Sequence, residues 1–300
     1  MIQDSRLKIE KLMNSQWALN ILYIPALLMF SLFIFVPFIQ GISISFMEWD
    51  GFSVNYTWVG VNKYIAVFTD PNFFTVIRNT FIYGLGSTLF QNLAGLLFAL
   101  LLDQKLHGEK LVRTLVYLPA IISALIMGYI WYFFFSYDYG AINDILALFG
   151  QEKLDWLASA DRSVWIITGV NTFQYLGISM VIYLAGLQNI PKDYYEAADI
   201  DGASSMSRFR GITIPLLMPA ITVSVVLNLI GGLKLFDVIA AMTGGGPGYE
   251  SASISTMIQQ MYFSRMDAGY AAAQGNIMFV IIAVISIWAL RFLRNKEVEM

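Results

Sequence analysis

Residues 194–217 read YYEAADIDGASSMSRFRGITIPLL and join two long apolar runs of the chain. Just before this polar stretch, Asn189 and Pro191 predict a helix start, because Asn caps helices well and Pro is tolerated in a first turn. Gly202 can adopt the positive φ that ends a helix, and Pro215 stands where the next apolar run begins. The sequence therefore predicts a helix, a glycine turn and a second short helix outside the apolar runs.

The composition is that of a membrane protein rather than a soluble domain. The chain of 300 residues is 57% hydrophobic and 13% charged, with a mean hydropathy of +0.63. Soluble domains carry about 25% charged residues, so much of this surface must face lipid. A net charge of -3 gives no basic field, and nucleic acid is therefore not expected as a partner. The absence of cysteine excludes disulfides, thiolate metal sites and cysteine nucleophiles.

Several apolar runs are long enough to cross a bilayer, whose core of about 30 Å needs roughly 20 helical residues. We predict membrane spans near 17–40, 80–102, 114–135, 165–188, 215–240 and 269–293. The first run is too long for a signal-peptide core and no small-residue cleavage site follows it, so we interpret it as a retained span. Residues 17–293 then form one transmembrane domain between an N-terminal segment, 1–16, and a tail, 294–300.

The distribution of Lys and Arg predicts the orientation. The N-terminal segment, the loops 103–113 and 189–214, and the C-terminal residues from Arg291 onward hold three basic residues each, whereas the alternate segments hold two each. Because basic residues concentrate in cytoplasmic loops, this bias places both termini and residues 189–214 in the cytoplasm. The Trp, Tyr and Phe residues of the outer segments suit either the membrane–water interface or contact with an external partner.

The loop 189–214 has a surface suited to a protein partner. Its acidic residues are Asp193, Glu196, Asp199 and Asp201, and its small residues include Ala197, Ala198 and Ala203. Ser204 or Ser205 could cap the second short helix. An acidic surface is unfavourable on anionic lipid, so a partner protein explains the loop better than the membrane does.

The spacing within this loop resembles the EAA loop of ABC importer permeases. Glu196-Ala197-Ala198 is followed after three residues by Gly202, and after nine more by Ile212-Thr213-Ile214-Pro215, in which Ile214 replaces the family's Leu. Further fragments resemble the carbohydrate-uptake (MalF-like) permeases in order: WVGVNKYIAVFTDPNFFTVIRNT, YLPAIISALIMGYIW, AGLQNIPKDYYEAADIDGA and LKLFDVIAAMTGGGP. The resemblance covers nearly the whole chain. It implies an all-α integral membrane fold, the six-transmembrane-helix bundle of type I importers (MetI-like).

In that family the EAA loop docks in a groove of a cytosolic ATPase subunit and moves with it. The resemblance therefore implies a coupling role for Glu196, Ala197, Ala198, Gly202 and Pro215 within and beside the loop 189–214. The alternative is an ordered connector with no coupling role. Such a connector would not need so regular a spacing of Glu, Gly and Pro.

The sequence offers no site for ATP or for catalysis. No G-x-x-x-x-G-K-[ST] motif occurs, and without such a phosphate-binding loop we expect no nucleotide binding. The single histidine, His107, lies in a loop, where a solvated side chain is the usual role. No Ser-His-Asp or metal-binding cluster can be assembled around it. We expect no enzymatic activity of this chain alone, no cofactor and no metal.

Polar residues inside predicted spans are costly and usually face a cavity or a neighbouring helix. In the sugar permeases the two spans that flank the EAA loop line the translocation cavity. The resemblance therefore places these residues on the substrate pathway: Asn171, Gln174, Tyr175, Asn228, Gly231 and Gly232. Amides suit sugar hydroxyls and aromatic rings suit C–H faces, whereas interhelical hydrogen bonding and close packing are an equally open interpretation. Lys234 and Asp237 are interpreted as an ion pair near the outer mouth.

The leading hypothesis is a permease subunit of an ABC importer for a sugar or oligosaccharide. The alternatives are the same architecture for a polyol or glycerol-phosphate solute and, from another class, a self-powered secondary transporter. That last class expects charged relays and usually inverted repeats, neither of which is found here. The resemblance implies a heterodimer with a second, homologous permease, two cytosolic ATPase subunits and an extracytoplasmic solute-binding protein. The chain would cross the cytoplasmic (inner) membrane several times and contact its lipid.

Overall fold

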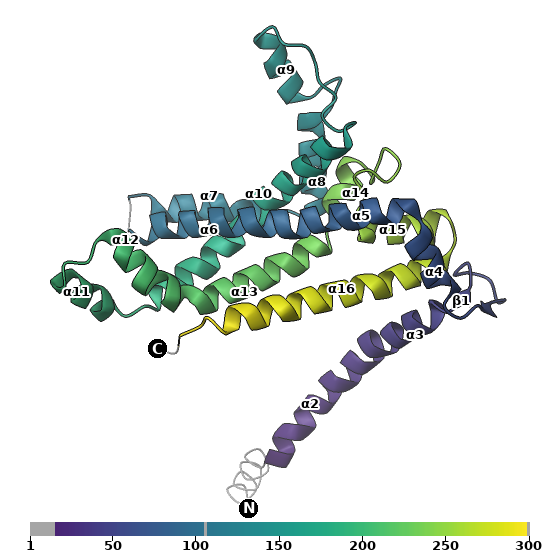
Figure 1. Ribbon diagram of the computed structural model, residues 1–300, viewed down its shortest axis with the longest axis horizontal. Coiled ribbons are helices and arrows are strands. Elements are labelled where there is room, and N and C mark those ends of the chain that lie inside the picture. The colour runs from purple at the N-terminus through teal and green to yellow at the C-terminus, as the bar shows by residue number, and fades with distance from the viewer. Residues whose placement is uncertain (1–15, 105–106, 299–300) are drawn as a thin grey trace, which may run out of the picture.

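The computed structural model describes residues 16–104 and 107–298, which are largely helical (Figure 1). The first half contains α2 (Gln16–Phe30), α3 (Val36–Ile44), β1 (Met47–Glu48), β2 (Thr57–Trp58), α4 (Asn62–Thr69), α5 (Pro71–Phe81), α6 (Ser87–Asp103), α7 (Glu109–Ile121), α8 (Ala124–Phe135) and α9 (Ala141–Leu148). The second half contains α10 (Ala160–Gln188), α11 (Lys192–Ile200), α12 (Ser205–Arg208), α13 (Ile214–Leu233), α14 (Asp237–Met242), α15 (Ile254–Gln259) and α16 (Ala268–Arg294). The π-helical turns are η1 (Ser31–Phe35), η2 (Ile82–Gly86), η3 (Phe209–Thr213) and η4 (Gln260–Ser264).

Within the described residues, five helical stretches are long and apolar enough to cross a membrane. They are Tyr23–Ile44, Pro71–Asp103, Ala160–Gln188, Ser205–Leu233 and Ala268–Arg294. The second stretch begins nine residues before the predicted span, because Asp70 caps α5 by accepting a hydrogen bond from the Asn72 N–H and Pro71 takes the first helical position. The N-terminal segment lies outside the described residues up to residue 15, as do residues 299–300 of the tail.

The predicted span 114–135 is not one straight helix. Helices α7 and α8 meet at an angle of 99°, and they form a sixth span only if the bent pair counts as one (Figure 1). Pro119 removes one helical hydrogen bond near the end of α7, and Ile122 and Ser123 are extended, with ψ of 137° and 136°. The run is apolar on both sides of this break, so its hydropathy gives no sign of the change in direction.

The predicted span 215–240 is displaced toward the N-terminus. Ser204 caps α12, and the π-helical turn η3 carries the helix without interruption into α13, so that it starts at Ser205 rather than at Pro215. The helix ends at Leu233, and α14 begins separately at Asp237. The expected ion pair between Lys234 and Asp237 is not among those that the described residues form.

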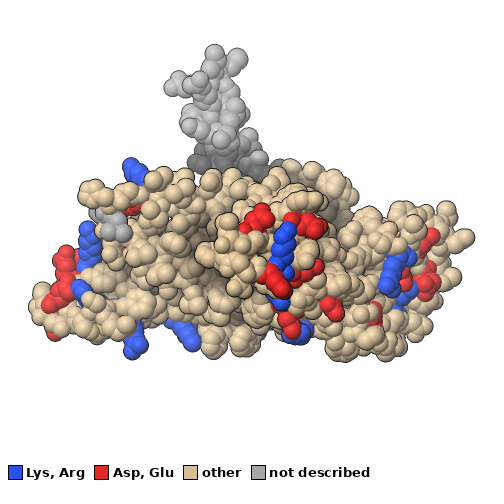
Figure 2. Space-filling view, turned by 90° about the horizontal axis from the view of Figure 1, so that it is seen from above, with Lys and Arg blue, Asp and Glu red and all other residues tan. Residues whose placement is uncertain are grey.

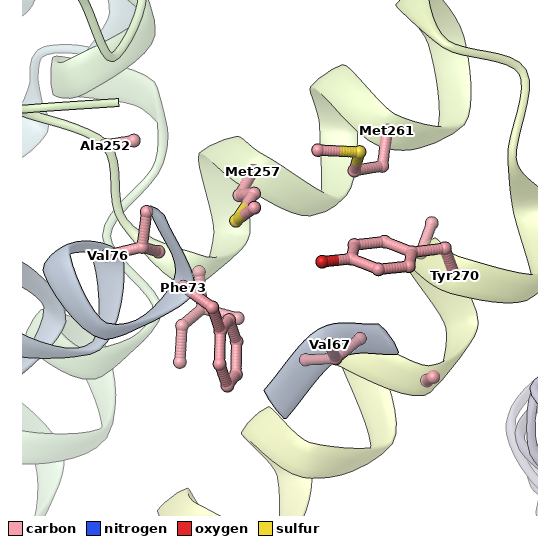
Figure 3. Packing of buried hydrophobic residues seen from close by; sticks show 10 residues of the cluster. Val67, Phe73, Val76, Ala252, Met257, Met261 and Tyr270 are labelled. Carbon is pink, nitrogen blue, oxygen red and sulfur yellow. The ribbon is translucent and has the colours of Figure 1, made fainter. Parts of the chain in front are cut away.

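The bundle has two ends that we name by their landmarks. The hairpin end carries the antiparallel pair β1–β2, α4 and α15, and the EAA end carries α11, α12 and the last residues of α16 (Figure 1). At the hairpin end Val67, Phe73 and Val76 face Met257, Met261 and Tyr270 across a buried apolar cluster (Figure 3). At the EAA end a second cluster joins α6, α10 and α13 through residues that include Ala99, Leu102, Tyr183, Leu187 and Leu217.

The N-terminal helix stands away from this bundle. Its stretch Tyr23–Ile44 has a mean hydropathy of 2.2 and no buried residue, and α2 diverges from α16 while α3 stays beside it (Figure 1). Large apolar side chains such as Leu28, Phe33 and Ile39 are more than half exposed. In a membrane protein such a surface contacts lipid or another apolar chain.

Candidate functional site

The loop between α10 and α13 has the local structure that its sequence predicts, with one difference at its start. The predicted cap by Asn189 is wrong: Asn189 ends α10, and Pro191 occupies the N-cap position of α11, which has no side-chain cap. At its other end the Gly202 N–H donates to the Asp199 carbonyl at 3.1 Å, and the Ala203 N–H donates to the Ala198 carbonyl at 2.9 Å. These bonds form a Schellman motif, which requires a residue with positive φ, and Gly202 has φ of +70°.

The second short helix, α12, begins directly after the Gly202 turn. The Ser204 hydroxyl, rather than that of Ser205, accepts a hydrogen bond from the Ser207 N–H at 3.3 Å and caps α12. Pro215 is half-buried and lies directly after the π-helical turn η3 within the continuous helix Ser205–Leu233, where its missing N–H removes one helical hydrogen bond. The helix, glycine turn and second helix predicted from the sequence are therefore confirmed as structure.

The residues with a predicted coupling role lie on the surface at the EAA end. Glu196, Ala197 and Gly202 are exposed, and Ala198 is half-buried. Within the fully described stretch 192–208, no side chain is buried. Acidic and basic groups gather at the end of the molecule that carries α11 (Figure 2). The arrangement presents a short helix to a partner without unfolding any part of the core.

Two side-chain contacts shape this loop. Arg208 forms an ion pair with Asp199, which links α12 to α11 within the loop itself. The Tyr195 hydroxyl lies 3.0 Å from the Thr213 hydroxyl, which links α11 to η3 at the start of the fifth long helix. A cavity of about 310 Å³ lies beside Tyr195, lined by residues that include Asp103, Glu109, Arg113 and Lys192.

On α10, the predicted substrate-pathway amides face the interior of the chain. Gln174 is fully buried, and its Nε2 donates to the Ile122 carbonyl at 2.9 Å. That carbonyl belongs to the break between α7 and α8, where a backbone group loses its helical partner. Asn171 is 2% exposed, and its backbone carbonyl accepts a hydrogen bond from Gln91 Nε2 at 2.9 Å.

On α13, two predicted pathway residues contact neighbouring helices. The Asn228 amide donates to the Ser179 hydroxyl of α10 at 2.7 Å. Gly232 packs against η2, and a Cβ there would lie 2.8 Å from the Ser87 hydroxyl and 2.9 Å from Gly84 Cα. These helices approach as closely as they do because no side chain separates them. The sequence indicated a polar face on α13 but gave no sign that Ser179 or Ser87 would be opposite it.

Two predicted pathway residues remain accessible. Tyr175 is half-buried on α10, and Gly231 is exposed, with nothing within 4 Å of the position that a Cβ would take there. A side chain at Gly231 would therefore displace no neighbouring group of the chain. Among the described residues, no group of three or more His, Asp or Glu side chains is placed to hold a metal ion.

The chain matches the family model described as binding-protein-dependent transport system inner membrane component, over residues 91–297. It is 35% identical to a probable starch degradation products transport system permease protein of Thermoanaerobacterium thermosulfurigenes, over 92% of this chain and 94% of that one. It is 32% identical to a trehalose/maltose transport system permease protein of Thermococcus litoralis, again over 92% and 94% of the two chains.

Among solved structures, the fold resembles a chain from a bacterial ABC transporter involved in the import of the acidic polysaccharide alginate. The TM-score is 0.81 at 27% identity, over 96% of this chain and 99% of that one. The matched residues 91–297 include α10, α11, α12 and α13, which carry every predicted site residue. The chain therefore belongs to the binding-protein-dependent transport system inner membrane component family, the multi-pass membrane permeases of ABC importers.

Proposed function

We propose that this chain is the transmembrane permease subunit of an importer that carries a sugar or oligosaccharide into the cell, driven by ATP hydrolysis on separate subunits. The observation that carries the proposal is the exposed helix α11, held in shape by its Schellman motif at the EAA end. The names of the starch-product and trehalose/maltose permeases support a carbohydrate solute. The accessible pathway candidates, Tyr175 and Gly231, carry no charge, and a phenol is an adequate partner for neutral hydroxyl groups.

The proposed importer contains a second, homologous permease chain. The stretch Tyr23–Ile44 supports this, because its apolar surface has no buried residue and extends beyond the chain's own bundle. A solved structure that this chain resembles at 26% identity, over 95% of this chain, is a bacterial alginate ABC transporter in complex with an alginate pentasaccharide-bound periplasmic protein. We propose a solute-binding protein at the hairpin end and two ATPase subunits at the EAA end.

The proposed orientation places both termini and the EAA end in the cytoplasm. The excess of Lys and Arg in the N-terminal segment, in loops 103–113 and 189–214 and in the tail supports it. The last residues of α16 also lie at the same end as α11 and α12 (Figure 1). A reporter that is active only outside the cell, fused after Met300, should be inactive, and activity there would reverse the orientation.

In the proposed mechanism, ATP-driven closure of the ATPase pair displaces α11, and α13 carries the displacement into the cavity wall. The Gly202→Leu and Glu196→Lys variants test it. A side chain at the positive φ of Gly202 strains the turn, and a lysine reverses one charge of the docking surface. Both variants should reach the membrane and lose uptake, together with the solute-stimulated ATPase activity of the assembled complex.

The matched control is Gly211→Leu, at an exposed glycine of η3 where a Cβ meets nothing within 4 Å and φ is not positive. This control should retain uptake. The coupling role of the loop would be refuted if the Gly202 and Glu196 variants assembled and transported like the unmodified chain.

The pathway proposal rests on the positions that the structure leaves accessible. Tyr175→Ala should lower uptake with assembly intact, because a ring facing the solute contributes contact without holding the fold. Asn228→Ala should also lower the yield of assembled complex, since it removes the bond to Ser179, worth about 1 kcal/mol. Equal uptake by the Tyr175 variant and the unmodified chain would assign that ring to packing alone.

A further inference from the structure

The stretch 192–208 has few connections to the rest of the chain. Its backbone continues into α10 and η3, but within this fully described stretch the Tyr195–Thr213 contact is the one side-chain hydrogen bond that leaves it. The Asp199–Arg208 ion pair closes within the stretch, and Asp199 is 59% exposed. That pair therefore shapes the loop without attaching it to the bundle.

Tyr195 also makes the apolar contact between α11 and the bundle. Its half-buried ring packs against the cluster at the EAA end, to which α6 contributes Leu102, α10 contributes Leu187 and α13 contributes Leu217. Thr213 is 6% exposed and immediately precedes α13. One side chain of α11 thus packs against the cluster at the EAA end through its ring and contacts the residue just before α13 through its hydroxyl.

The other route from α11 to α13 is the backbone through Gly202. That residue is exposed, and nothing lies within 4 Å of the position that its Cβ would take. On the side toward α6 and α7, the 310 Å³ cavity separates polar groups that form no ion pair among the described residues. Neither route offers packed side chains or a hydrogen-bond network of the kind that carries a displacement from one element to another.

We propose that Tyr195 and Thr213 are positioning residues that make α11 and the start of α13 move as one body. The inference rests on the proposed function, in which α11 is displaced by an ATPase subunit. In this arrangement the exposed Glu196 and its neighbours provide the docking surface, and the half-buried Tyr195, about 100° away around the same helix, provides the connection to the spans. The hydroxyl pair fixes the angle between α11 and η3. The Tyr195 ring fixes how closely α11 packs against the apolar cluster at the EAA end.

The test uses the full chain assembled with its partner permease, ATPase subunits and solute-binding protein in liposomes, and it measures solute molecules imported per ATP hydrolysed. Tyr195→Phe and Thr213→Val each remove one hydroxyl and keep the shape of the side chain. Each should lower this ratio about fivefold, the worth of one ordinary hydrogen bond. Assembly, measured by co-purification, and basal ATPase activity should not change.

Three further variants separate positioning from general stability. Tyr194→Phe is the matched control, because Tyr194 is 45% exposed and its hydroxyl has no partner among the described residues. Thr213→Ser keeps a hydroxyl and should keep the ratio. The double variant Tyr195→Phe/Thr213→Val should equal either single variant, because both remove the same bond and their effects cannot add.

An unchanged ratio in Tyr195→Phe and Thr213→Val, or additive losses in the double variant, would overturn the inference. The proposed function has a separate criterion in the same assay. If Gly202→Leu abolishes uptake while the hydroxyl variants have no effect, the loop couples and only the positioning role fails. If Gly202→Leu also has no effect, the coupling role itself fails.

Discussion

The two ends of the molecule use the same local devices and connect them differently. At the hairpin end, Asp267 caps α16 and also forms a salt bridge with the buried Lys63 at 3.0 Å. Asp70 caps α5 and also accepts a hydrogen bond from the Tyr270 hydroxyl at 3.0 Å. At the EAA end, the Schellman motif and the Ser204 cap bond only to residues within the loop. A cap that is shared between elements fixes their relative position, whereas a local cap fixes only the shape of its own helix.

This difference suits a docking role for the EAA end and a structural role for the hairpin end. Local stability varies across a protein, and a docking element is expected at the less stable end of that range. The hairpin end joins α4, α5, α15 and α16 around a buried cluster, so it can hold the bundle together while the EAA loop is displaced. The variants below test the contrast, from the largest expected effect to the smallest.

Gly269→Ala should be the most damaging small change. A Cβ at Gly269 would lie 2.0 Å from the Met47 carbonyl oxygen and 3.1 Å from Lys63 Cε, and the first of these atoms is backbone that cannot move aside cheaply. We expect a loss of about 3 kcal/mol or more in the free energy of unfolding, measured by chemical denaturation in detergent. Gly275→Ala on the same helix has nothing within 4 Å and should be neutral or slightly stabilising. Equal stability of the two variants would show that the hairpin end is not closely packed.

Lys63→Met should cost about 2 kcal/mol. Lys63 is 6% exposed and contacts Glu48 at 2.9 Å and Asp267 at 3.0 Å, and its loss would leave these carboxylates without their cation. The cost stays below that of a fully buried pair, because the Glu48 and Asp267 side chains are 63% and 33% exposed. Thermal unfolding in detergent measures it, and Lys153→Met, at an exposed lysine, is the control.

The difference in stability between the unmodified chain and Lys63→Met should depend on pH. Burial disfavours the charged ammonium, but the hydrogen bonds to Glu48 and Asp267 outweigh it and raise the pKa of Lys63 above its ordinary value of 10.5. A raised lysine pKa contributes stability that is present below the unfolded value and is lost as pH rises through the folded one. The stability difference between the unmodified chain and Lys63→Met should therefore be constant from about pH 7 to 9 and shrink above about pH 10.5. A difference that grew in alkali would show that Lys63 is not held as a cation.

Gly202→Ala should cost about 1 kcal/mol, and only locally. The substitution places a Cβ at φ of +70° but introduces no clash, since nothing lies within 4 Å. Hydrogen exchange should speed up in residues 192–208 while the unfolding temperature of the bundle stays nearly constant. Gly211→Ala, where φ is not positive, controls for the added methyl group. Faster exchange at the hairpin end would mean that the two ends are coupled more tightly than their contacts indicate.

Much of the fold could be predicted from the sequence because its main signals are local. Long apolar runs predicted four helices to within a few residues at one or both ends, and the Gly202 turn followed from residue type alone. The break at Ile122 could not be predicted, because hydropathy reports composition and not direction. The start of the fifth helix was missed because a π-helical turn let the helix pass through Pro215.

In the candidate site too, local contacts could be predicted from the sequence and long-range contacts could not. The glycine turn and the serine cap of α12 depend on neighbours within about five residues, so the sequence predicts them, although Asn189 ends α10 instead of capping α11. The partners of Gln174 and Asn228 are 52 and 49 positions away in the chain, and nothing in the local pattern identifies Ile122 or Ser179. Residue type showed that these amides need partners in an apolar setting, but not whether a solute or another helix provides them.

Asp199→Asn should have the smallest effect on stability. The variant removes the charge that pairs with Arg208, but the Asp199 side chain is 59% exposed and the Arg208 side chain is 29% exposed, so water screens the pair. We expect a loss of about 0.5 kcal/mol at most, decreasing further with added salt. Exchange of the α11 amides at low and high salt measures it, with Asp201→Asn as the control, because Asp201 is exposed and forms no ion pair among the described residues. The contrast between the ends predicts that this variant affects the loop alone. If instead it lowered the unfolding temperature as much as Lys63→Met does, the EAA end would be holding the bundle together, and the division of roles between the two ends would have to be abandoned.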